Sequence, residues 1–92
     1  DAQKVAEADI VIKNGLFLEG WLDELIAGAA RSKPVYVATE GIDPIVSKNV
    51  HSSPDPHAWM NPVYGIEYAR NIKNALIQND TENAAFYEDN FE

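Results

Sequence analysis

The stretch "DIVIKNGLFLEGWLDELIAGAARSKPVYVA", residues 9–38, contains the pattern that decides the fold. It opens with an unbroken β-branched run at 10–12, and the turn signal at 14–15 closes that run. It ends with a second apolar run at 35–38, and the preceding Pro34 fits the first position of a strand. The two runs predict two short, buried, parallel strands.

Between these runs, apolar residues recur with the spacing of one face of an amphipathic helix. The residues on this face are Leu18, Trp21, Leu22, Leu25, Ile26 and Ala29. Glu19 lies in the first turn of the predicted helix, while Arg31 and Lys33 follow its end, as the helix dipole favours. Strand, helix and strand at this spacing predict a βαβ unit.

After the second strand, residues 41–56 lose all periodicity and are rich in Gly, Pro, Ser, Asn and Asp, which predicts a long loop. A helix is expected to begin near Pro62, because proline is tolerated at the first helical position. Its predicted buried stripe comprises Gly65, Tyr68, Ala69, Ile72, Ala75 and Leu76. The opposite, solvent-facing side is predicted to carry Glu67, Arg70, Asn71, Asn74 and Gln78.

Helices are also expected at both ends of the chain. Residues 1–8 have the spacing of the last turns of a helix, and Asp80 or Thr81 is suited to cap a C-terminal one. The apolar face of that last helix would carry Ala84, Tyr87 and Phe91. The order αβαβα, in a chain that begins without Met, is expected for a piece of a larger α/β domain.

Composition limits the possible functions. The 92 residues form one domain at most, and 46% apolar residues indicate a packed unit. A net charge of -8 disfavours nucleic acid and anionic membrane surfaces as partners. The absence of cysteine excludes disulfides, zinc ribbons and thiol nucleophiles.

The candidate site is His57, within "PDPHAWMNP" at 54–62. It falls in the loop beyond the second strand, where open α/β sheets bind ligands. Pro56 and Pro62 stiffen the backbone around it, and Trp59 is placed to shield the imidazole from water. Spacing alone leaves two interpretations open: a metal ligand, or a turn histidine with a hydrogen-bonded ring, which is the commoner case.

Other side chains in this loop are weaker candidates for a functional role than His57. His51 has nothing to stiffen it, and 52–53 are serines without the G-x-S-x-G elbow of a nucleophile. Glu40 and Asp55 are candidate catalytic acids, but a solvated loop surface explains them equally well. The remaining aromatic residues fit helical stripes and are predicted to lie in the core: Trp21, Tyr68, Tyr87 and Phe91.

Three segments resemble a known family: "ADIVIKNGLFLEGWLDELI" (8–26), "KPVYVATEGI" (33–42) and "DPHAWMNPVYGIEYARNIKNALIQND" (55–80). They are similar to the cluster A-I solute-binding proteins, or metal-binding lipoproteins, of bacterial ABC transporters for zinc, manganese and iron(II). The D-P-H-x-W block is specific to that family, and the A-D-x-V-x-x-N-G-x-x-x-E block supports it independently. The resemblance covers the chain from about Ala8 to its end.

This resemblance implies two α/β lobes joined by one rigid helix, with a metal ion in the cleft between them. The chain, residues 1–92, would be a fragment of the N-terminal lobe with parallel strands flanked by helices, and about 81–92 would lead toward the connecting helix. Four side chains hold the metal in the family, and His57 matches the second. The first, a histidine, is expected before Asp1, and the others, a Glu or His and an Asp, beyond Glu92.

The implied function is extracytoplasmic capture of a divalent metal ion and its delivery to an ABC transporter permease in the membrane, from the periplasm or a lipid anchor. No enzyme activity is expected. Residues 41–56 lack the His-rich insertion of many zinc members, and "HAWMNP" is closer to manganese and iron members. Manganese is therefore favoured over zinc or iron. One alternative is an adhesion or interaction lipoprotein module, and another is a metallohydrolase, which lacks a base placed beside His57.

Overall fold

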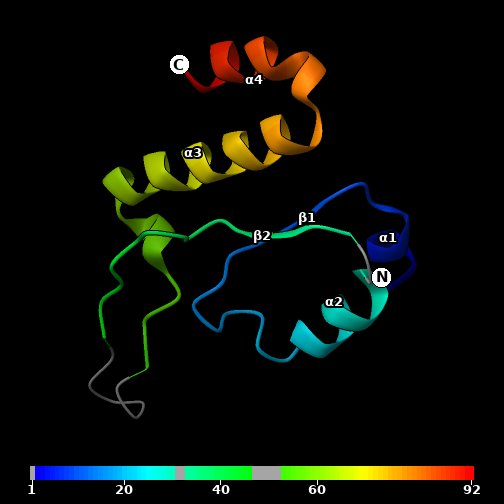
Figure 1. Ribbon diagram of the computed structural model, residues 1–92. Coiled ribbons are helices and arrows are strands. Elements are labelled where there is room, and N and C mark those ends of the chain that lie inside the picture. The colour runs from blue at the N-terminus through cyan, green and yellow to red at the C-terminus, as the bar shows by residue number, and fades with distance from the viewer. Residues whose placement is uncertain (1, 31–32, 47–52) are drawn as a thin grey trace.

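The computed structural model describes residues 2–30, 33–46 and 53–92, arranged as an α/β unit (Figure 1). The helices and strands in chain order are α1 (Ala2–Glu7), β1 (Val11–Lys13), α2 (Asp23–Ala30), β2 (Val35–Val37), the 3-10 helix η1 (Ala58–Met60), α3 (Pro62–Asn79), the 3-10 helix η2 (Thr81–Asn83) and α4 (Ala84–Phe91).

The two strands pair in parallel, which confirms the predicted βαβ unit. Val11 lies opposite Val35, and Lys13 lies opposite Val37. The N–H of Ala38 donates to the carbonyl of Lys13 at 2.8 Å, so the pairing continues past the end of β2. Figure 1 shows α1 and α2 together on one side of the strands and α3 with α4 on the other. The fold class expected from the sequence is therefore observed.

The helix between the strands is shorter than predicted, because it begins only at Asp23. Leu16 and Phe17 have φ angles of 53° and 64°, in the left-handed region that a right-handed helix does not allow. The residues before Asp23 are consequently held in turns, and the side chain of Trp21 is 81% exposed. The prediction that Trp21 belongs to the core was wrong, since its apparent helical spacing lies in a turn.

The core is small, as the length of the chain predicts. Its buried apolar residues come from α2, the segment after β2, η1 and α3, and are Ile26, Ala38, Ile42, Ala58 and Ala75. Thr39 is the buried polar residue of the described chain, and its hydroxyl donates to the carbonyl of Asn14 at 2.7 Å. The buried residues therefore lie on both sides of the two strands, with Ile26 in α2 and Ala75 in α3 (Figure 1).

Helix α3 begins at Pro62, as predicted, and the Asn61 side chain caps it by accepting a hydrogen bond from the N–H of Val63 at 3.0 Å. The predicted faces are partly wrong. Ala69 is exposed, whereas the Asn71 amide donates to the carbonyls of Ala38 and Glu40 at 2.8 and 2.9 Å. These carbonyls follow the end of β2 and need a donor, so a polar side chain faces inward here.

Asp80 joins α3 to α4, where its Oδ2 accepts hydrogen bonds from Asn83 Nδ2 at 2.9 Å and from the Tyr87 hydroxyl at 2.7 Å. The bond from Asn83, and then that from Tyr87, hold the pKa of the Asp80 carboxyl below its ordinary 3.8. The hydrogen bond to Asp80 raises the pKa of Tyr87 above 10.0. Both directions favour the charged Asp80 paired with a neutral Tyr87.

The Asp80 contacts predict how stability changes in acid. A carboxyl whose pKa is lowered on folding adds stability above pH 3.8 and loses it as the pH falls through the folded-state pKa. Between pH 5 and 2, we expect the urea midpoint to fall more steeply in the unaltered protein than in Asp80→Asn, which keeps an acceptor oxygen but cannot titrate. All other carboxyl groups are common to both proteins, so parallel curves would contradict this role of Asp80.

Candidate metal centre

His57 lies at the start of η1, and two main-chain contacts fix the segment that leads to it. Val46 and Pro54 form an isolated antiparallel bridge. The N–H of Asp55 donates to the carbonyl of Ile45 at 2.7 Å. The two arms of the loop are thus joined just before His57. The other histidine of the sequence, His51, falls outside the described residues, as does Ser52.

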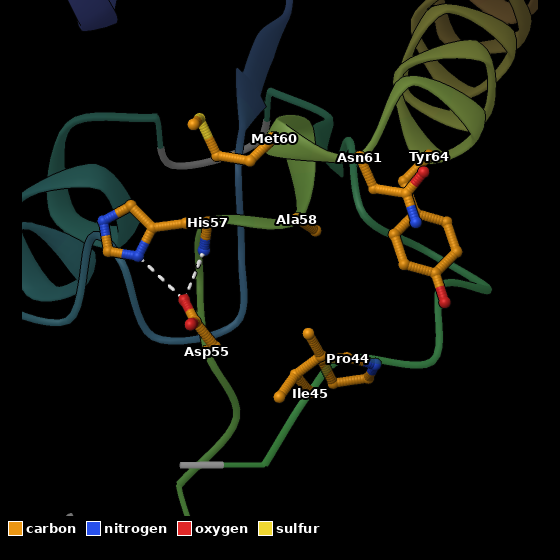
Figure 2. Close-up of a pocket in the computed structure, with 8 residues that line it drawn as sticks. All are labelled: Pro44, Ile45, Asp55, His57, Ala58, Met60, Asn61 and Tyr64. Atoms are coloured by element: carbon orange, nitrogen blue, oxygen red, sulfur yellow. Dashed lines mark hydrogen bonds and ion pairs between the residues drawn. The ribbon is translucent and has the colours of Figure 1, made fainter.

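The Asp55 carboxylate holds His57 through two contacts to one oxygen, one from the backbone and one from the ring (Figure 2). Asp55 Oδ1 accepts from the backbone N–H of His57 at 2.9 Å and lies 2.8 Å from Nδ1 of its ring. Because an ionised carboxylate only accepts hydrogen bonds, Nδ1 carries the hydrogen in this contact. In the neutral ring, Nε2 then has a free lone pair, which is what a metal ligand requires.

The charge state of Asp55 also favours the arrangement in which its carboxylate accepts the hydrogen on Nδ1 of His57. The hydrogen bond from the backbone N–H of His57, followed by that from its ring, lowers the pKa of the Asp55 carboxyl below its usual 3.8. Asp55 is therefore charged at neutral pH. Metal-bound histidines commonly donate their second ring N–H to such a carboxylate, which fixes the tautomer and the ring orientation.

The imidazole is accessible, with 59% of its side chain exposed. The Trp59 ring lies beside it, with the two ring centroids 5.1 Å apart, but the imidazole stays mostly open to water, so the predicted shielding by Trp59 is only partial. A cavity of about 300 Å³ adjoins His57 and is lined by Pro44, Ile45, Asp55, His57, Ala58, Met60, Asn61 and Tyr64. In Figure 2 the Asp55–His57 pair stands at one end of this lining and Tyr64 at the other.

Within residues 2–30, 33–46 and 53–92, no group of three or more His, Cys, Asp or Glu side chains is placed to hold a metal ion. Zn²⁺ sites usually take four protein or water ligands, and Mn²⁺ favours oxygen-rich shells. The described part of the chain thus provides one oriented imidazole, which is a fraction of a complete shell. The carbonyl of Glu40, the other candidate acid, accepts from Asn71 in α3, and its side chain does not line the cavity beside His57.

Asn14 is a residue of this site that sequence reasoning missed, since it indicated only a turn. Its Nδ2 donates to the carbonyl of Pro56 at 3.1 Å and to that of Gly15 at 2.9 Å. Its Oδ1 accepts from the Tyr68 hydroxyl at 2.5 Å. The sequence signal that could have indicated Asn14 is the N-G-x-x-x-E block. In the structure, the Glu19 carboxylate of this block accepts hydrogen bonds from the N–H groups of both Asn14 and Gly15.

In this α/β unit, one histidine lies beside a cavity past the carboxyl ends of the strands, and a carboxylate orients its ring. These are features of a metal-binding module. The family model described as "zinc-uptake complex component A periplasmic", ZnuA, matches residues 1–92. The chain belongs to this family of metal-binding solute-binding proteins. Members of this family are solute-binding proteins of ABC transporters and are not enzymes, in agreement with the expectation from the sequence.

Relatives and solved structures agree with this assignment. The manganese ABC transporter substrate-binding lipoprotein scaA of Streptococcus gordonii is 39% identical over 98% of this chain and 32% of its own length. The Mn-bound periplasmic metal binding protein from Candidatus Liberibacter asiaticus has a TM-score of 0.89 at 38% identity, over 99% of this chain and 34% of its own. Its Cd-bound structure has a TM-score of 0.90 at 36% identity, with the same coverage. The chain spans about a third of the length of the curated relatives it matches.

Proposed function

We propose that this chain is part of the N-terminal lobe of an extracytoplasmic protein that captures a divalent metal ion and delivers it to an ABC transporter permease. In this proposal residues 1–92 belong to that lobe, and about 81–92 lead toward a helix that connects it to a second lobe. The whole protein would act in the periplasm or from a lipid anchor at the cell surface. No helix among the described residues is both long and apolar enough to cross a membrane.

The observation that carries this proposal is the Asp55–His57 pair. One carboxylate oxygen contacts both the ring and the backbone N–H of His57, so the imidazole has a defined tautomer and a defined direction. Nε2 of the exposed ring is the atom that would bind the ion. The other ligands would come from residues before Asp1 and after Glu92, which would close the coordination shell across a cleft.

Manganese is the ion we favour, with zinc and iron(II) as the alternatives. The relative from Streptococcus gordonii is named for manganese, and solved neighbours contain Mn or Cd. Residues 41–56 contain no His-rich insertion that would concentrate zinc. An imidazole accepts all of these ions, so the choice among them depends on the oxygen ligands that complete the shell.

Metal titration tests the function directly. The whole protein that contains this chain is expected to bind one Mn²⁺ per molecule in calorimetric titrations, and Zn²⁺ in competition with it. A strain without the protein should grow poorly in manganese-depleted medium and recover when Mn²⁺ is added. Absence of binding, together with normal growth in depleted medium, would contradict the proposal and favour an adhesion or interaction role.

A further inference from the structure

We propose that Asn14 is a positioning residue of the metal site, which holds the backbone of Pro56 and thereby aims His57 at the ion. This inference rests on the proposed function, because it assigns Asn14 a role through His57. Asn14 follows β1 directly, whereas Pro56 lies 42 residues later, next to the histidine. Asn14 would not touch the ion itself.

Asn14 joins three separate parts of the fold, two through its side chain and one through its backbone carbonyl. Its amide nitrogen binds the carbonyl of Pro56, and its oxygen accepts from Tyr68 in α3. Its backbone carbonyl accepts from the hydroxyl of the buried Thr39, past the end of β2, at 2.7 Å. Asn14 therefore lies where both strand ends, α3 and the histidine loop meet, the histidine loop being residues 53–61.

The side-chain amide of Asn14 makes the Pro56 and Tyr68 contacts at once, because it carries both a donor and an acceptor. The NH₂ group is a donor for the carbonyls of Gly15 and Pro56, and the oxygen is an acceptor for Tyr68. Burial raises the pKa of the Tyr68 hydroxyl, so this group remains a donor at neutral pH. The bond from Tyr68 fixes which way the amide points, and thus keeps its donors toward Pro56.

These contacts act on His57 through the two residues before it. The N–H of Asp55 is bound to Ile45 on one side, and the carbonyl of Pro56 is bound to Asn14 on the other. The proline ring fixes the φ angle between these two anchors. Asp55 is thereby attached to the other arm of its loop, and the backbone that carries the imidazole is attached to the residue that follows β1, as a preorganised ligand requires.

The test compares Asn14→Ala and Tyr68→Phe with the matched control Tyr36→Phe, in the whole protein that contains this chain. Tyr36 lies in β2, and its hydroxyl accepts a hydrogen bond from Asn79 Nδ2 at 2.7 Å; it is not among the residues that line the cavity beside His57. We expect Mn²⁺ binding to weaken about tenfold in Asn14→Ala, the lower end of the effect of outer-shell partners. Tyr68→Phe should weaken it in the same direction by less, and Tyr36→Phe should leave it unchanged.

Hydrogen exchange of the metal-free proteins separates positioning from general destabilisation. In Asn14→Ala and Tyr68→Phe, amide exchange should accelerate in 53–61 but not in α4, whose contacts do not involve Asn14. Unchanged Mn²⁺ affinity in both variants, or equal acceleration in 53–61 and α4, would overturn the inference. If the unaltered protein binds no Mn²⁺, the proposed function fails, while exchange in 53–61 still decides whether Asn14 anchors the loop.

Discussion

Replacing His57 by alanine is expected to weaken Mn²⁺ binding by more than about a hundredfold in the whole protein that contains this chain. Loss of an outer-shell partner alone reduces metal affinity roughly 10–100-fold, and removal of a directly bound imidazole should exceed that range. His57 is exposed and outside the core, so the free energy of unfolding should change by less than about 0.5 kcal/mol. The loss would then belong to the site and not to the fold.

Two aspartate variants calibrate this result. Asp55→Ala removes the carboxylate that orients His57 and should weaken Mn²⁺ binding about tenfold. Asp43→Ala removes the same charge from the same loop without a recorded side-chain contact to His57, and should have little effect. Calorimetry with a competing chelator measures all four affinities, and thermal melting checks the fold. Equal affinity of the His57→Ala variant and the unaltered protein would remove His57 from the site.

The second large effect is expected at Gly15, where alanine should destabilise the fold by about 3 kcal/mol. Gly15 has a φ of +85°, which L-residues rarely adopt. A Cβ at this position would overlap Val37 Cγ1 and lie 2.9 Å from Thr39 Oγ1. Strain in the backbone and overpacking against β2 therefore add, and each is worth on the order of 1–2 kcal/mol.

Two other glycines separate these contributions. Gly41 has a φ of +81° with nothing within 4 Å of an added Cβ, so Gly41→Ala should cost only the strain, about 1 kcal/mol. Gly65 lies inside α3 with open space around it, and Gly65→Ala should stabilise by about 0.5–1 kcal/mol. Urea unfolding curves give all three values. A Gly15→Ala loss no larger than that of Gly41→Ala would show that Val37 and Thr39 yield freely.

The architecture was largely predictable, because its signals are local. A β-branched run, a turn signal and a proline-started helix each depend on neighbours within a few residues, and β1, β2 and α3 appear where these signals lie. The prediction was wrong for Trp21, because helical spacing does not reveal that Leu16 and Phe17 have left-handed backbones. It was also wrong for Asn71, which was predicted to face solvent because it is polar. Its amide instead donates to the carbonyls of Ala38 and Glu40, after β2.

For the site, the sequence by itself determined which residue is the candidate ligand: the motif around His57 is short, stiff and specific to a family. Its close partner Asp55 is two residues away, within reach of the same turn. Only the tertiary structure decided what holds this turn in place. Asn14 meets Pro56 and Tyr68 across 42 and 54 residues, and hydrogen bonds over such separations leave no periodicity in the chain. They exist because β1 ends beside α3 and the histidine loop, a proximity that folding alone creates.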